Sequence, residues 1–366
     1  MPKSLEEAAE DYEAARYAEN QEVARKLRAA RSELETQRTR AVEALGEADE
    51  ARRELALYEA DYSERPEWAK PPSEAEGSNR GTLVAFLSDT HYGEIVRADE
   101  MDDYNAYNLK IAEARTARFF ERVIRIARSY FAGVEYDGIV LALGGDLVSG
   151  DIHDELTETN EATTYETVLW AVPKLAAGVE MLAEEFGQVH VVSAPGNHGR
   201  TTRKPHAKKA SANNADTLIA HLVARQLEGR EGVTFNIPAT ADVRFEVYRW
   251  RFSMEHGEVF QKGFAGSAEI GSLGPVKRGT MRKLTQATAE GKSFDYNLVG
   301  HFHQYVPAAS QAFVMNGSLK GYDEFARRHH FKPEPAQQAL MVCTPERGIT
   351  TQAPVFVAGD HKSEGW

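Results

Sequence analysis

Short apolar runs that alternate with long helical stretches set the strongest limit on how this chain can fold. Three runs, TLVAFLS (82–88), GIVLALGG (138–145) and VHVVSA (189–194), are separated by helical stretches at 107–131 and 161–186. Runs this short and this apolar are typical of buried strands, and strands that alternate with helices form largely parallel sheets. The sequence therefore predicts an α/β fold. Two more runs, RFEVYRWRFSM and FDYNLVG, follow as further strands.

The first 64 residues have a different pattern, because apolar residues recur at heptad spacing and residues 4–64 contain no proline. The pattern lasts for about five heptads and is typical of the a and d positions of a coiled coil. It predicts a long N-terminal helix or weak coiled coil over 1–64, then a proline-rich linker over 65–81 and a catalytic domain over 82–366. Residues 20–62 are expected to associate with a second copy or a partner protein, or to fold onto the rest of the chain.

Composition excludes several classes of protein. The net charge is −13, and 17 acidic against 10 basic residues in 1–64 account for over half of it, which argues against a general polyanion binder. The single cysteine, Cys343, excludes an internal disulfide. No apolar run is long enough to cross a bilayer, and the first residues do not resemble a signal peptide. We expect a soluble cytoplasmic protein that makes no membrane contact.

Polar residues that can bind a metal follow each of the five apolar runs, where carboxyl ends of strands would bring them to one edge. They are Asp89 and His91, Asp146, Asn197 and His198, His256, and His301 and His303. Residues two apart in an extended segment point to the same side, and one carboxylate can bridge two cations. Oxygen and imidazole ligands without a thiolate suit Mn²⁺, Fe, Zn²⁺, Co²⁺ or Ni²⁺.

In this order, the motifs D-x-H, GD, GNH, H and GHxH resemble the calcineurin-like metallophosphoesterase superfamily over residues 82–305. The resemblance implies a four-layer fold, a two-sheet sandwich flanked by helices, and two divalent cations, with Mn²⁺ preferred. It implies that a hydroxide between the cations attacks phosphorus in line, and that His198 is a catalytic residue over the substrate. The first cation would bind Asp89, His91 and His303, Asp146 would bridge, and Asn197, His256 and His301 would hold the second.

Two details extend the resemblance. Many members of the superfamily have Asp or Glu directly after the catalytic histidine, where this chain has Gly199, so Asp151 or Asp154 is the candidate to orient His198. The later runs AFVMNG, QALMVCTP and PVFVAG are expected to complete the second sheet of the sandwich.

A cationic segment follows His198, and no carboxylate lies between Glu185 and Asp216. Such a run is usually a solvated face, but beside a dinuclear site Arg200, Arg203 and Lys204 would bind substrate phosphates. With a second basic stretch at 263–283, it favours an extended polyanion. The leading hypothesis is a phosphodiesterase acting on nucleic acid, similar to the DNA-repair exonuclease branch and to enzymes encoded by phages. The alternatives are a phosphomonoesterase acting on a phosphoprotein or a small metabolite, and a non-catalytic coiled-coil scaffold with a relic site.

Overall fold

The structure, a computed structural model of the chain, describes residues 13, 16–17, 20–41, 79–261 and 273–366. The chain divides into two compact units, Met1–Glu76 and Gly77–Trp366.

The described part of the first unit consists of residues 13, 16–17 and 20–41, all of them helical. Its apolar side chains Val23, Leu27 and Leu34 are exposed. Residues 42–64 of the expected arm, and most of the expected linker, lie outside the described residues. The coiled coil and its association through 20–62 therefore stay predictions.

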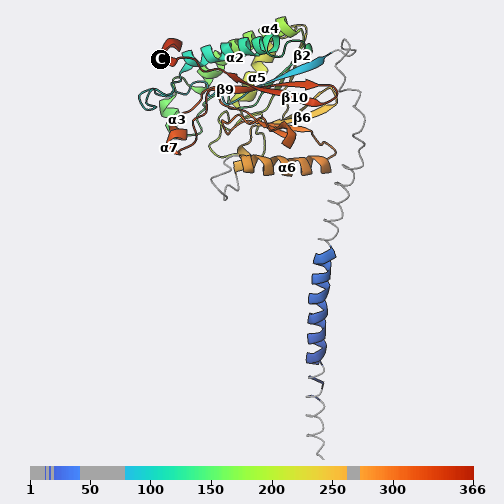
Figure 1. Cartoon of the computed structure of the whole chain (residues 1–366). Helices are drawn as coiled ribbons and strands as arrows, with labels where there is room; N and C mark the ends of the chain where they lie inside the picture. The colour runs from blue at the N-terminus through green and yellow to red at the C-terminus, as the bar shows by residue number, and fades with distance from the viewer. Residues whose placement is uncertain (1–12, 14–15, 18–19, 42–78, 262–272) are drawn as a thin grey trace, which may run out of the picture. The chain divides into compact units, whose positions relative to one another are not determined.

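The second unit contains two mixed β-sheets with helices on both sides (Figure 1). The strands are β1 (Arg80–Leu87), β2 (Glu135–Leu143), β3 (Val189–Ser193), β4 (Val233–Asn236), β5 (Asp242–Val247), β6 (Trp250–Glu255), β7 (Tyr296–Val299), β8 (Phe313–Met315), β9 (Gln337–Thr344) and β10 (Gly348–Phe356). The helices are α2 (Leu109–Ser129), α3 (Asp154–Thr159), α4 (Thr164–Phe186), α5 (Ala215–Gln226), α6 (Leu273–Ala289), α7 (Glu324–Arg328) and α8 (His361–Glu364), with short 3₁₀ turns η2 (Glu258–Gln261) and η3 (Ala309–Gln311). None of the helices in the described ranges has the length and apolar character needed to cross a membrane.

Strand order groups the parallel strands together on one side of each sheet. The six-stranded sheet runs β10-β9-β1-β2-β3-β4, with β1 to β4 mutually parallel and β9 antiparallel to β1. The four-stranded sheet runs β5-β6-β7-β8, with β6 to β8 parallel and β5 antiparallel. These parallel strands end in the loops that carry the predicted metal ligands.

Alternating side chains on β1 explain the layers. Leu83 and Ala85 pack with the core beneath α2, α4 and α5, whereas Val84 and Phe86 pack against the second sheet. Beyond the second sheet, Val276 of α6 packs in a third cluster. Figure 1 shows α2 and α4 on one side of the sheets and α6 on the opposite side. The prediction of an α/β two-sheet sandwich flanked by helices is confirmed.

Two expectations about strands were wrong. The run 244–254 forms a hairpin of two strands, because the chain turns at Tyr248, whose φ is 56°. Of the three late runs, only β8 joins the second sheet, while β9 and β10 extend the first. Strand β9 has apolar side chains on both faces, with Leu340 against the helices and Met341 against the second sheet. Such a strand fits beside β1, whose own side chains pack into the same two clusters.

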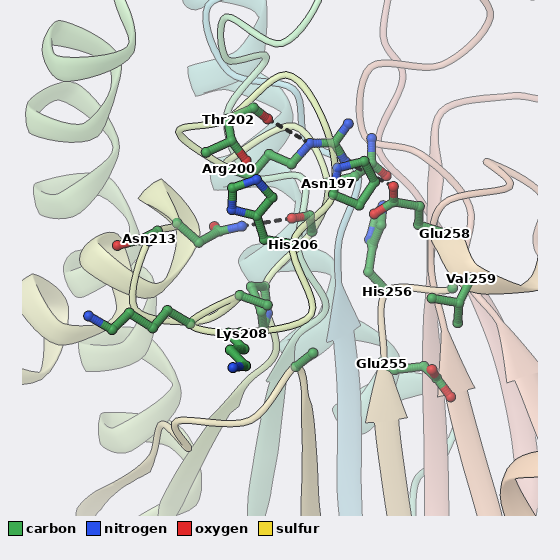
Figure 2. Close-up of a pocket in the computed structure, with 18 residues that line it drawn as sticks. Asn197, Arg200, Thr202, His206, Lys208, Asn213, Glu255, His256, Glu258 and Val259 are labelled. Atoms are coloured by element: carbon green, nitrogen blue, oxygen red, sulfur yellow. Dashed lines mark hydrogen bonds and ion pairs between the residues drawn. The ribbon is translucent and has the colours of Figure 1, made fainter.

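The carboxyl ends of β1, β2, β3, β6 and β7 supply the loops in which the predicted ligands lie. A pocket opens beside them, between the loops that follow β3 and β6 (Figure 2).

Candidate metal centre

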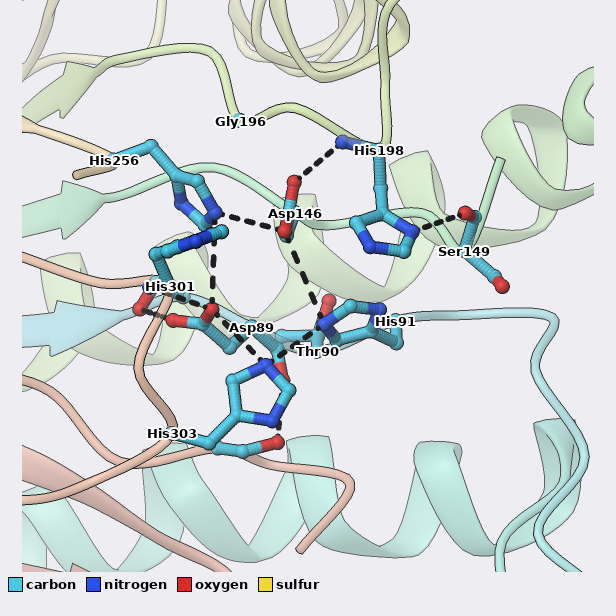
Figure 3. Close-up of polar contacts among 12 residues, drawn as sticks. Asp89, Thr90, His91, Asp146, Ser149, Gly196, His198, His256, His301 and His303 are labelled. Carbon is cyan, nitrogen blue, oxygen red and sulfur yellow. Dashed lines mark hydrogen bonds and ion pairs between the residues drawn. The ribbon is translucent and has the colours of Figure 1, made fainter. Parts of the chain in front are cut away.

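Two triads of ligand side chains meet at this edge of the two sheets (Figure 3). Within each triad, the ligand atoms lie within 4.8 Å of one another, which is close enough for one ion to contact all three. The members are Asp89, His91 and His303 in the first triad, and Asp146, His256 and His301 in the second. A third group, His91, Asp146 and His198, meets the same distance limit and shares one member with each of these triads. The division is the one that the superfamily resemblance implies for two cations.

Asp146 connects the two triads. Its Oδ2 lies 2.8 Å from His256 Nε2 and 4.0 Å from His91 Nε2, and its Oδ1 accepts a hydrogen bond of 2.7 Å from the main-chain N–H of His198. The carboxylate is 1% exposed, so water does not compete for these contacts. A single carboxylate between two ligand sets is the geometry that a bridging ligand needs.

The first triad converges on a small space. His91 Nε2 and His303 Nε2 lie 3.1 Å apart, and His303 Nε2 lies 3.4 Å from Asp89 Oδ1. The same Asp89 oxygen accepts a hydrogen bond of 2.8 Å from the main-chain N–H of His301. The two GHxH histidines are therefore divided between the triads, while the loop that carries both is held by Asp89.

The backbone of this site is strained. Left-handed φ angles between 46° and 71° occur at five of the predicted ligands, although none of them is glycine; they are Asp89, His91, Asp146, His301 and His303. Each such residue costs about 1–3 kcal/mol, and the surrounding fold must hold it in place. Strain of this kind gathers at functional sites, where it aims side chains at a common point.

Burial sets the protonation of the histidines. It lowers the pKa of His91 to about 4 and that of His301 to about 3, so both imidazoles are neutral at pH 7 and can bind a cation. Burial also opposes the charged form of His256, but the Asp146 carboxylate outweighs it and raises the pKa of His256 to about 10. A cation bound there must displace that proton.

Buried polar atoms without hydrogen-bond partners show whether the site suits a cation. Within the described residues, neither Asn197 Oδ1 nor His301 Nε2 has a hydrogen-bond partner, although both atoms are buried. A buried polar atom left unpaired costs about 1–3 kcal/mol. A cation would supply the partner for both, and the oxygen and imidazole donors fit a divalent ion such as Mn²⁺ or Zn²⁺.

Asp216, which the sequence reasoning missed, holds two of the ligand loops together. Its fully buried carboxylate accepts hydrogen bonds from the main-chain N–H groups of Asp146 (2.9 Å), Leu147 (3.0 Å) and Gly196 (2.9 Å). Burial, followed by the nearby Asp146, raises the pKa of Asp216 to about 6. In the sequence, the only signal for Asp216 was an acidic residue in the first turn of α5, ahead of the apolar residues of that helix.

A main-chain carbonyl, and neither of the expected aspartates, orients His198. The ring Nδ1 lies 2.7 Å from the carbonyl oxygen of Ser149; this oxygen can only accept, so Nδ1 carries a proton. Among the described contacts, Asp151 bonds Thr164 and Asp154 pairs with Arg203, and neither reaches the imidazole. The expectation for these two aspartates was wrong.

Gly199 is explained by a close approach of two chain segments. A β-carbon at this position would collide with the side-chain oxygen of Asn214 and lie 3.0 Å from Cγ of Asp216. Since these two residues begin α5 and support the ligand loops, an Asp or Glu at 199 would displace them.

A buried ion cluster stands behind His91. Glu94 Oε2 lies 3.3 Å from His91 Nδ1, and Lys320 Nζ lies 2.6 Å from both Glu94 Oε1 and Asp323 Oδ2. Burial opposes ionisation of Glu94, but Lys320 outweighs it and holds the pKa of Glu94 below its usual range. A carboxylate at this distance favours a proton on His91 Nδ1, which would leave the Nε2 lone pair for a cation.

The predicted substrate-binding cations differ in their surroundings. Arg200 is half-buried, and its Nη1 lies 2.9 Å from Glu258 Oε1. Arg203 is exposed and donates to Asp154 at 3.2 Å. Lys204 is exposed and has no ion pair among the described residues. Only Arg200 of the three lines the pocket beside the metal ligands.

Comparisons with known proteins add little to this picture. No family model and no curated protein matches the sequence. Among solved structures, vacuolar protein sorting 29 from Cryptosporidium parvum is 15% identical, with 72% of this chain and 85% of that chain covered and a TM-score of 0.30. A hypothetical protein from Pyrococcus horikoshii is 13% identical (77% and 90% covered, TM-score 0.37), and a dimetal phosphatase from Danio rerio is 10% identical (76% and 99% covered, TM-score 0.33). Likenesses this low carry no conclusion about activity.

Proposed function

We propose that this chain is a metal-dependent phosphoesterase that hydrolyses phosphodiester bonds, with nucleic acid as its substrate class. The observation that carries the proposal is the pair of ligand triads joined by the buried Asp146 carboxylate. If these residues held two cations, the pair would supply the charge stabilisation that in-line displacement at phosphorus needs.

The triads support a division of the ligands between two cations. Asp89, His91 and His303 would hold the first cation, and Asp146 would bridge. The second cation would be held by Asn197, His256 and His301; Mn²⁺ is the preferred ion. When bound, two divalent cations supply a Lewis acid that activates water and neutralises phosphoryl charge.

The proposal gives His198 the role of an acid–base residue. Because its Nδ1–H is donated to the Ser149 carbonyl, Nε2 is the nitrogen left for the substrate. The His198 ring lies 4.6 Å from the His91 ring, at the side of the first triad. As an imidazolium, it can donate a proton from Nε2 to the leaving oxygen of the ester.

The cationic loop after His198 supports a polyanionic substrate. Residues 200–209 contain five Lys or Arg residues and no acid. Cations beside the site can contact the flanking phosphates of a nucleic acid, which a small phosphomonoester lacks. Turnover assays can distinguish a phosphodiester substrate from a phosphomonoester substrate.

We expect the purified protein with Mn²⁺ to cleave end-labelled DNA and a small aryl phosphodiester faster than the matching aryl phosphomonoester. The measurement is parallel turnover of the three substrates, with an EDTA-treated sample to exclude metal-independent activity. Turnover of the monoester alone would replace the proposal by the phosphomonoesterase reading. No turnover of any substrate would favour a non-catalytic scaffold.

The Glu94→Gln variant is expected to bind Mn²⁺ about 10–100-fold more weakly, because carboxylates that orient a metal-binding histidine contribute about that much to affinity. The amide keeps the shape of the side chain but removes the charge that faces His91 Nδ1. Calorimetric titration with Mn²⁺ measures the effect without any substrate.

The matched control for that variant is Asp323→Asn. It removes a carboxylate from the other side of Lys320 and has no contact with His91 among the described residues. Wild-type affinity in Glu94→Gln, or an equal loss in both variants, would contradict a specific role of Glu94.

A further inference from the structure

A pocket shares two residues with the metal centre. It is lined by Asn197 and His256, which are ligands of the proposed second cation, and it extends away from them along the loop 200–214 (Figure 2). A substrate whose scissile phosphate lies at the cations would therefore continue into this pocket. We refer to it as the loop pocket.

The charges of the loop pocket do not cancel. Both acids in its lining already have cationic partners, since Glu258 pairs with Arg200 and Glu255 Oε1 lies 2.8 Å from Lys283 Nζ. Lys208 and Lys209 also line the pocket and are exposed. In the part of the chain that the structure describes, neither lysine has an ion-pair partner. The pocket thus has two cations available for an anionic group.

The size of the loop pocket fits one phosphate with part of its sugar. Its free volume is about 110 Å³. One water-sized group needs about 10–15 Å³ by this measure, so there is room for a group of several heavy atoms. Lysine ammonium groups bind a phosphate as point charges and do not require a fixed orientation.

We propose that the loop pocket binds the phosphate next to the scissile one in a nucleic-acid strand, through Lys208 and Lys209. This inference rests on the proposed phosphodiesterase function and names the substrate contacts that the function needs. It also changes the residues involved, because Arg203 and Lys204, which the sequence nominated, do not line the loop pocket.

Binding can be tested without catalysis. Fluorescence anisotropy of a labelled eight-nucleotide single-stranded DNA, in EDTA and over a range of salt concentrations, measures the affinity and its salt dependence. We expect the double variant Lys208→Ala/Lys209→Ala to bind more weakly. Each neutralised phosphate contributes about 0.7 to the slope of log affinity against log salt, so loss of this one phosphate contact should make the slope shallower by about 0.7.

The matched control is Arg203→Ala/Lys204→Ala, which removes the same charge from the same loop outside the loop pocket. We expect its affinity and slope to stay near those of the wild type. Equal losses of DNA affinity in the two double variants would contradict the proposal, because they would indicate that the whole loop attracts DNA by its charge. A wild-type slope in the Lys208/Lys209 variant, or no binding by the wild type, would also overturn it.

Turnover of a small aryl phosphodiester with Mn²⁺ separates this inference from the proposed function. The substrate has no flanking phosphate, so the Lys208→Ala/Lys209→Ala variant should hydrolyse it at the wild-type rate. A loss there would mean that the lysines serve the catalytic centre, which overturns the inference. No turnover by the wild type would count against the proposed function, while the binding result would still decide the pocket.

Discussion

Replacing Asp146 by asparagine is expected to abolish hydrolysis and to remove most of the bound divalent metal. The amide keeps the shape of the side chain, but one charged oxygen becomes an N–H donor that faces His256 or the cations. Breaking a buried charge pair from one side typically costs about 3–5 kcal/mol, which corresponds to roughly two to four orders of magnitude in affinity. Metal content by mass spectrometry and turnover of an aryl phosphodiester measure the two effects.

Asp137→Asn is the matched control, because this aspartate lies on β2, near its amino end, and bonds Arg80 and Tyr248 instead of the metal ligands. Its metal content and turnover should match those of the wild type. Circular dichroism melts of both variants would show whether they fold. Full turnover in a folded Asp146→Asn protein would contradict the assignment of Asp146 as the bridging ligand.

His198→Ala is expected to lower kcat by about 10²–10⁴-fold while the protein keeps its metal. The imidazole supplies acid–base catalysis in the proposal, whereas its main-chain N–H, which donates to Asp146, is unaffected by the substitution. Loss of rate with full metal content separates this role from that of a ligand. Steady-state kinetics and metal analysis of the same sample give both numbers.

His153→Ala provides the comparison for that variant. This exposed histidine has its ring 5.6 Å from the His198 ring, so it is a second imidazole beside the site but further from the ligand triads. We expect a rate close to wild type. A loss of metal in His198→Ala would make that residue a ligand, and equal losses of rate in the two variants would remove its special role.

Much of the fold and of the site could be predicted from local patterns. Buried strands of an α/β fold are short and apolar, and β1, β2 and β3 follow this rule closely enough to be located from composition alone. Because parallel strands end at one edge, the polar residues after them had to meet there. The meeting of the loops after β1, β2 and β3 is therefore a consequence of strand direction, which the alternation with helices already implied. The triads also need the second sheet, which supplies His256, His301 and His303.

Other features were decided only by tertiary structure, because they depend on contacts between segments far apart in the chain. The pattern of β9 identifies a strand covered on both faces, but its pairing with β1 joins segments that are far apart in the chain. Asp216 and Glu94 are single carboxylates with no motif, and each acts on a loop brought near by folding. Local sequence patterns identify the candidate metal ligands, whereas the side chains that hold those ligands in place can be identified only after distant segments pack together.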